Sequence, residues 1–74
     1  SMDNEDPKKL MKKIEDLESS KIWQSSALEM KGFLFLKTNE KEKAVETFQS
    51  ILSLPGSPSS LANRAKNMIE YLKD

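Results

Sequence analysis

Residues 26–48, with the sequence SALEMKGFLFLKTNEKEKAVETF, decide the fold of this chain. The stretch is typical of two helices joined by a short turn at Thr38 and Asn39. A glycine within a helix costs about 1 kcal/mol relative to alanine, so Gly32 marks a place where another backbone comes close. The second helix offers Ala44, whose methyl group also permits close approach. We therefore expect two helices in tight contact where Gly32 faces Ala44.

Two aromatic residues flank these small ones. Phe35 lies about one turn after Gly32, and Phe48 lies about one turn after Ala44. We expect both rings to fill the volume that the small residues leave between the helices. Hairpins of this kind build helical-repeat proteins, whose usual work is holding other polypeptides.

An amino-terminal helix is predicted from a start signal at Asp6 and Pro7. Aspartate is favoured at the N-cap and proline at the first helical position. We expect this helix to end near Ser19 and Ser20, either of which is suited to cap the next helix. Its apolar residues recur at helical spacing and form one stripe. They are Leu10, Met11, Ile14 and Leu17.

The second helix is expected over residues 21–37 and the third over residues 40–53. Apolar residues of the second helix occupy more than one face, which is typical of a helix packed between neighbours. Asn39 is expected in the turn, because its side chain tolerates the left-handed backbone conformation that often ends a helix.

A loop and a fourth helix complete the prediction. Residues 55–58, with the sequence PGSP, are the clearest loop signal. Ser57 is expected to cap a helix that has Pro58 at its first position and runs to about Leu72. No segment shows the alternating pattern of a strand. The sequence thus predicts an all-α fold, with four helices in an array of antiparallel hairpins.

Domain boundaries follow from the same signals. Residues 1–5 are expected to be a disordered tail, in which Ser1 and Met2 are interpreted as the remnant of a cleaved tag. Residues 6–74 form one helical domain whose central repeat covers about residues 25–58. A domain this small buries only about 60% of the surface that its unfolded chain exposes. Packing against further repeats of a longer protein, or against another copy, would therefore stabilise it.

The charge composition argues against nucleic-acid binding. Twelve Lys and Arg residues balance twelve Asp and Glu residues, so no net field attracts the chain to a polyanion. The lysines of residues 8–13 are followed by the acidic residues of 15–18, which is typical of a solvated helix face. No apolar run approaches the roughly 20 residues of a membrane span. Any membrane connection would need a segment outside this sequence.

The residue types that carry most catalysis are missing. The chain has no histidine and no cysteine, which removes the commonest general base and the Cys–His and Ser–His–Asp arrangements. The acidic residues show no EF-hand spacing, and the two glycines form no phosphate-binding loop. We therefore expect no catalytic residue, no cofactor and no metal site.

The central hairpin resembles the tetratricopeptide repeat (TPR), a unit of about 34 residues. Leu28 stands where the motif has tryptophan, and Pro55 is its closing proline, one place early. The chain departs from the motif at Lys31, Asn39 and Ile51, which replace leucine, glycine and alanine. The residues on the glycine, aromatic, alanine and aromatic positions are Gly32, Phe35, Ala44 and Phe48.

A longer stretch, from about Leu17 to Leu72, resembles the C-terminal part of membrane-anchored TPR-like proteins of the proteobacterial envelope. This resemblance implies a parent protein with one amino-terminal membrane helix and a domain on the periplasmic side of the inner membrane. Some members of that family associate with the Sec translocon and periplasmic chaperones. A cytoplasmic location is the alternative. The matching residues are Trp23, Ala27–Glu29, Gly32, Ala44, Phe48, Pro55, Pro58, Leu61, Arg64, Ala65 and Leu72.

In a TPR the first helix of each hairpin lines a concave groove, so the resemblance implies a protein- or peptide-binding face on the second helix. Phe33 is either a docking anchor there or core covered by the first helix, and its helical spacing favours core. Trp23 is likewise either an exposed anchor or a plug between the first two helices. The residues predicted to face a partner are Ser26, Glu29, Met30, Phe33, Leu36 and Lys37.

Three functions remain open at this point. The first is a non-catalytic TPR-like scaffold or co-chaperone domain that docks an extended segment or a helix of another protein. The second is a homo-oligomerisation domain, in which exposed apolar helix faces pair to form a homodimer. The third is a cytoplasmic helical adaptor outside the TPR-like family.

Overall fold

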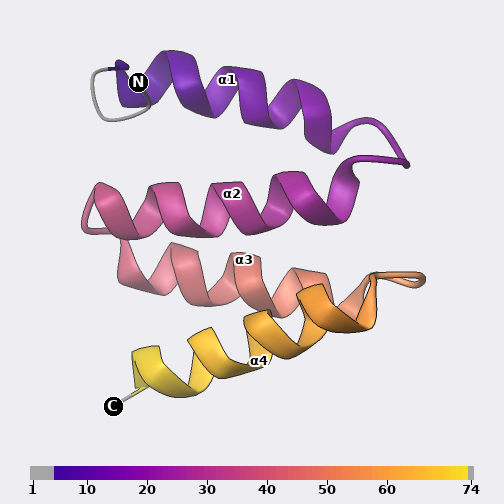
Figure 1. The fold of residues 1–74 in the computed structure, drawn as a ribbon. Helices are drawn as coiled ribbons and strands as arrows, with labels where there is room; N and C mark the ends of the chain where they lie inside the picture. Colours follow the sequence, from indigo (N-terminus) through magenta and orange to yellow (C-terminus); the bar gives the residue numbers. More distant parts are fainter. Residues whose placement is uncertain (1–4, 74) are drawn as a thin grey trace.

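The computed structural model describes residues 5–73, which form an array of four helices. Each helix runs back alongside the one before it (Figure 1). Residues 1–4, with the predicted tag remnant, and Asp74 lie outside the described residues. The all-α prediction is confirmed over the described part of the chain. The helices are α1 (Pro7–Glu18), α2 (Gln24–Lys37), α3 (Lys41–Ser53) and α4 (Ser59–Lys73).

The start of α1 confirms the predicted signal. Pro7 is the first helical residue, and the Asp6 carboxylate accepts a 3.0 Å hydrogen bond from the backbone N–H of Lys8. This bond satisfies one of the amide groups that the first turn of a helix leaves without a partner.

The turn between α1 and α2 differs from the prediction. α2 begins at Gln24 rather than at residue 21, and Trp23 holds the N-cap position without a side-chain bond to the helix. Neither serine caps α2. The Ser19 hydroxyl donates to the carbonyl of Asp16 in the last turn of α1 at 2.7 Å, and the N–H of Ser20 donates to the carbonyl of Leu17 at 3.1 Å. Serine bonds readily to nearby backbone groups, and here those groups belong to the preceding helix.

The turn between α2 and α3 has the predicted left-handed residue. Asn39 has φ of 62°, and its N–H donates to the carbonyl of Leu36 at 3.1 Å. The N–H of Glu40 donates to the carbonyl of Phe35 at 2.7 Å. This pair of bonds is the Schellman arrangement, which satisfies carbonyl groups at a helix end. It reverses the chain within three residues and sets α3 antiparallel to α2.

The loop before α4 contains a second correction. The hydroxyl of Ser57, which was expected to cap α4, donates to the carbonyl of Ile51 at 2.8 Å and so holds the end of α3. α4 begins at Ser59, one residue later than predicted. Gly56 has φ of 83°, a conformation that glycine adopts without steric penalty.

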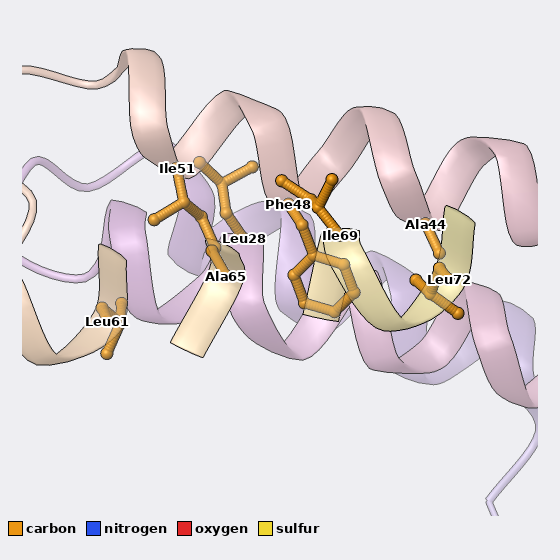
Figure 2. Close-up of a cluster of buried hydrophobic side chains, with 8 residues drawn as sticks. All are labelled: Leu28, Ala44, Phe48, Ile51, Leu61, Ala65, Ile69 and Leu72. Carbon is orange, nitrogen blue, oxygen red and sulfur yellow. The ribbon is translucent and has the colours of Figure 1, made fainter. Parts of the chain in front are cut away.

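The larger of two buried clusters lies between α2, α3 and α4. Figure 2 shows its side chains spread along the helices, with the ring of Phe48 between Leu61 at one end and Leu72 at the other. Phe48, Ile51 and Ala44 are completely buried. We term this cluster the main core. It consists of Leu28, Ala44, Phe48, Ile51, Leu61, Ala65, Ile69 and Leu72.

The smaller cluster joins α1 to α2, and we term it the α1 core. Leu10 and Ile14 of α1 pack against Ala27 and Leu34 of α2, and all four are buried. Next to it, an ion pair of 3.0 Å links Glu18 of α1 to Lys31 of α2. α2 therefore contributes to both cores.

The contact between α2 and α3 is close at Gly32, but its partner is not the predicted one. A Cβ atom at Gly32 would lie 2.7 Å from two ring carbons of Phe48, and Ala44 is not among the nearest atoms. Gly32 lies seven residues before Asn39, whereas Ala44 lies five after it and so nearer the turn. The backbone of Phe48 lies farther from the turn than that of Gly32, but helical side chains lean toward the N-terminus of their helix. That lean carries its ring back to the level of Gly32.

Candidate protein-binding face on α2

Three sides of α2 are covered by other helices. Ala27 and Leu34 pack in the α1 core, whereas Leu28 and Gly32 are buried on the side of α3. The Glu29 carboxylate forms an ion pair with Arg64 of α4. The fourth side of α2 is exposed to solvent.

Four of the six residues predicted to face a partner lie on this fourth side. Their spacing of three or four residues places them on one face of the helix, and each is exposed. Phe33 is 45% exposed and Met30 is 37% exposed, and because they are neighbours on the helix they form one exposed apolar patch. We term this surface the open face. It consists of Ser26, Met30, Phe33 and Lys37.

The other two predicted residues point toward α4. The Glu29 carboxylate accepts two hydrogen bonds from the guanidinium group of Arg64, at 2.8 and 3.0 Å. These bonds and the negative charge of Glu29 raise the pKa of Arg64. Leu36 is half-buried and packs against the main core. Both residues therefore border the open face and hold α4 beside it.

A hollow of about 180 Å³ opens between α1 and α2 at the open face. Its surface is almost entirely apolar, because α1 contributes two core side chains and α2 contributes the edge of its exposed stripe. The lining residues are Leu10, Ile14, Met30, Phe33, Leu34 and Lys37. Concave apolar surfaces with few polar groups are typical of binding sites.

Phe33 combines features of both predicted interpretations. Its ring meets the buried ring of Phe48 edge to face, with 5.3 Å between the centroids. Phe33 is 45% exposed, so α1, which borders it through Leu10 and Ile14, does not cover it completely. The contact with Phe48 fixes the orientation of Phe33 while its outer side remains available, which is the arrangement expected of a rigid aromatic anchor.

Leu17 on α1 and Trp23 at the start of α2 are two further exposed apolar side chains, and neither was among the residues predicted to face a partner. Trp23 is 55% exposed, so it does not act as a plug between α1 and α2. Leu17, near the end of α1, is 40% exposed. Trp23 precedes Met30 by seven residues, or two helical turns, and therefore lies on the same side of α2. That interval was the sequence signal for including Trp23.

The residues of the TPR-like signature lie mainly inside the fold. Leu28 and Gly32 are buried on α2, and Ala44 and Phe48 are buried on α3. Pro55 is exposed in the loop that follows α3. Phe35 is half-buried, and the ammonium group of Lys43 lies 5.8 Å from the centre of its ring.

Two carboxylates of the described residues have lowered pKa values, and both are in surface contacts. A hydrogen bond from Lys13 and its positive charge lower the pKa of Glu5. Hydrogen bonds from Thr38 and Lys43 lower the pKa of Glu40. Both contacts hold helix ends in place: Glu5 precedes α1, and Glu40 is the N-cap residue of α3.

Two further findings concern residues 5–73 as a whole. None of their helices is long and apolar enough to cross a membrane. Their acidic side chains form no group of three or more that is arranged to hold a metal ion.

The comparisons with known proteins add no relative. No protein-family model, curated protein or solved structure matches this chain.

Proposed function

We propose that this protein is a non-catalytic, TPR-like interaction module that holds another polypeptide along the open face of α2. The observation that supports this proposal best is the partial exposure of Phe33 and Met30 beside the apolar hollow. Complete burial of a large apolar side chain is worth about 1.5–3 kcal/mol, and less than half of that area is still exposed in Phe33 and Met30. Covering them with a partner recovers part of that free energy.

The surroundings of the open face favour this location over the outer sides of the array. The exposed positions of α1 carry mainly lysine and acidic residues, from Lys8 to Asp16. The exposed positions of α4 are polar except for Tyr71. These sides suit solvent, as the ends of a helical-repeat array do. The TPR-like repeat pattern of the central hairpin supports the same assignment, because the first helix of each TPR hairpin lines the binding groove.

The proposed setting is a longer bacterial envelope protein, with this domain on the periplasmic side of the inner membrane. It rests on the resemblance of residues 17–72 to membrane-anchored TPR-like proteins, in which a scaffold or co-chaperone role would follow. A cytoplasmic adaptor remains the alternative setting. Locating the tagged full-length protein by cell fractionation distinguishes the two.

Nuclear magnetic resonance titration tests the binding face. We expect amphipathic peptides, added to the ¹⁵N-labelled protein, to shift the amide signals of residues 23–37 and of the first half of α1. Phe33→Ser should abolish these shifts while the far-ultraviolet circular dichroism spectrum stays helical. Tyr71→Ser is the matched control, because Tyr71 is an aromatic residue that is 76% exposed but lies outside the hollow. Equal loss in both variants, or shifts confined to other helices, would refute the proposal.

A further inference from the structure

We propose that the polypeptide on the open face is a second copy of this chain, with its α2 antiparallel to the first. This inference rests on the proposed function, because it names the occupant of the same face. Three properties of the surface lead to it: the spacing of the apolar side chains, the scarcity of polar groups, and the distribution of charge along α1.

The apolar side chains on the exposed side of α2 follow a coiled-coil interval. Trp23, Met30 and Phe33 are separated by seven and three residues, which are the intervals of positions a, a and d in a heptad. From Trp23 to Phe33 the stripe extends about 15 Å along the helix. Leu17 follows Leu10, which lines the hollow, by seven residues, so it lies on the same side of α1 and widens the stripe near Trp23.

A helix fits this stripe better than an extended chain. Ser26 and Lys37 are the polar members of the open face, and they offer few hydrogen-bonding groups. An extended segment would bring backbone N–H and C=O groups against apolar side chains, and burying these groups without partners is costly. A helix satisfies its own backbone and presents side chains alone.

The charges beside the open face are divided between its two ends. α1 runs antiparallel to α2 (Figure 1). Leu10, in the first half of α1, lines the same hollow as Phe33, so the second half of α1 lies toward Trp23 at the start of α2.

Lys9 in the first half and Asp16 in the second half are exposed on the side of α1 that faces away from Met11, and Lys13 on the same side is ion-paired with Glu5. Lys8 and Glu15 lie on the other side of α1, where Lys8 neighbours Met11 and Glu15 neighbours Lys31.

This division is self-complementary about a two-fold axis. In an antiparallel pair the two α1 helices lie side by side, so Lys9 of each copy lies toward Asp16 of the partner subunit. In a parallel two-fold pair the two α1 helices lie on opposite sides of the paired α2 helices, so these charges do not meet. The chain has no net charge, so two copies do not repel each other as whole molecules. Overlap of the apolar side chains is greatest when Trp23 lies against Phe33 of the partner subunit and Met30 lies against Ser26 of the partner subunit.

A charge-swap experiment by sedimentation equilibrium tests the pairing. We expect the dimer fraction of the natural sequence to rise as the protein concentration increases from micromolar to millimolar. Added salt should raise the dissociation constant of the dimer. Lys9→Glu and Asp16→Lys should each weaken the homodimer by about fivefold, because each reversal acts twice in a symmetric pair. An equimolar mixture of the two variants should form mixed dimers at least as tightly as the natural sequence does.

Neither charge variant should destabilise α1, because both substitutions favour the helix. Lys9→Glu places a negative charge near the positive end of the helix dipole, and Asp16→Lys places a positive charge near the negative end. Unchanged helicity with a weakened dimer therefore identifies the interface rather than the fold.

Disulfide trapping fixes the register. The chain has no cysteine, so a mixture of Ser26→Cys and Met30→Cys has no background thiols. We expect these two variants to form a mixed disulfide faster than a mixture of Ser26→Cys and Asn63→Cys, whose second site lies on the exposed side of α4.

Two outcomes would overturn the second-copy proposal. One is a monomer throughout the concentration range, in which case peptide-induced shifts on α2 would still support the proposed function with an unlike helix as partner. The other is a dimer that both charge reversals leave unchanged. Loss of peptide binding to the open face, by contrast, would refute the proposed function itself.

Discussion

The main core and the α1 core are built around the same helix but differ in how firmly they hold their neighbours. The main core has eight buried side chains from three helices, and two of them, Phe48 and Ile51, are large and completely buried. The α1 core has four, and α1 contributes Leu10 and Ile14 to it. α3 and α4 are therefore anchored by many more buried atoms than α1 is.

Electrostatics increases the contrast between the two regions. The lysines of α1 lie near the positive end of its helix dipole, and its acidic residues lie near the negative end, which disfavours the isolated helix. The Asp6 cap and the Glu18–Lys31 ion pair oppose this effect only at the two ends. The comparison indicates that α2 is fixed by the main core, while α1 depends on its packing against α2.

The largest effect is expected from removing the centre of the main core. Phe48→Ala should lower the free energy of unfolding by about 3–5 kcal/mol, which approaches the whole stability of a domain this small. Urea unfolding followed by circular dichroism measures the change. Leu52→Ala, at a position 42% exposed on the same helix, is the control and should change stability far less. Similar losses in the two variants would mean that Phe48 is not central.

A smaller and more local effect is expected in the α1 core. Ile14→Ala removes a completely enclosed side chain that is 1% exposed, at a cost of about 2–4 kcal/mol. If α1 is the weaker region, its amide hydrogens should exchange faster in the variant while those around Phe48 keep their protection. Hydrogen–deuterium exchange read by mass spectrometry resolves the two regions. Equal loss of protection in α1 and α3 would show one cooperative unit instead.

An intermediate to small effect is expected at the contact between α2 and α3. Gly32→Ala gains about 1 kcal/mol of helix propensity, but the new methyl group would lie 2.7 Å from the buried Phe48 ring. Overpacking of this kind costs about 1–3 kcal/mol, so we expect a net loss of stability of up to about 2 kcal/mol.

A double-mutant cycle checks the cause of that loss. In a Phe48→Leu background the smaller side chain leaves room, so Gly32→Ala should become neutral or stabilising. The same penalty in both backgrounds would exclude the ring as the source.

The smallest effect is expected from acid. Contacts with Thr38 and Lys43 lower the pKa of Glu40 below its ordinary value of 4.5. A lowered folded-state pKa means that the ionised group stabilises the fold above its ordinary pKa. This stabilisation is lost as pH falls through the lowered value. Melting curves at a series of pH values should show a slightly shallower decline below pH 4.5 for Glu40→Gln than for the natural sequence. An unchanged decline would show that Glu40 does not contribute.

Local signals explain which parts of the fold were predictable from the sequence. The Asp6–Pro7 start and the left-handed Asn39 depend on a few neighbouring residues, and both were predicted correctly. Ser19 and Ser57 were assigned to the wrong helix, because a serine hydroxyl has backbone partners on either side at similar energy. The choice between them depends on how the chain continues in three dimensions.

The candidate site was predictable to a similar degree. The periodicity of α2 and the TPR-like resemblance placed Ser26, Met30 and Phe33 on one face, which the structure exposes. Glu29 and Leu36 were included among the residues predicted to face a partner, because the pattern of α2 alone does not show where α4 lies. The partner of Gly32 was missed for the same reason, since it depends on the lean of a side chain across the hairpin.

The open face of α2 is tested most directly by an isotope-filtered nuclear Overhauser experiment on a mixture of labelled and unlabelled chains. This measurement detects only contacts between copies. The predicted result is a set of signals from Met30 and Phe33 to Ser26 and Trp23 of the partner subunit. Intermolecular signals confined to the outer sides of α1 or α4, or none at millimolar concentration, would contradict the pairing along α2.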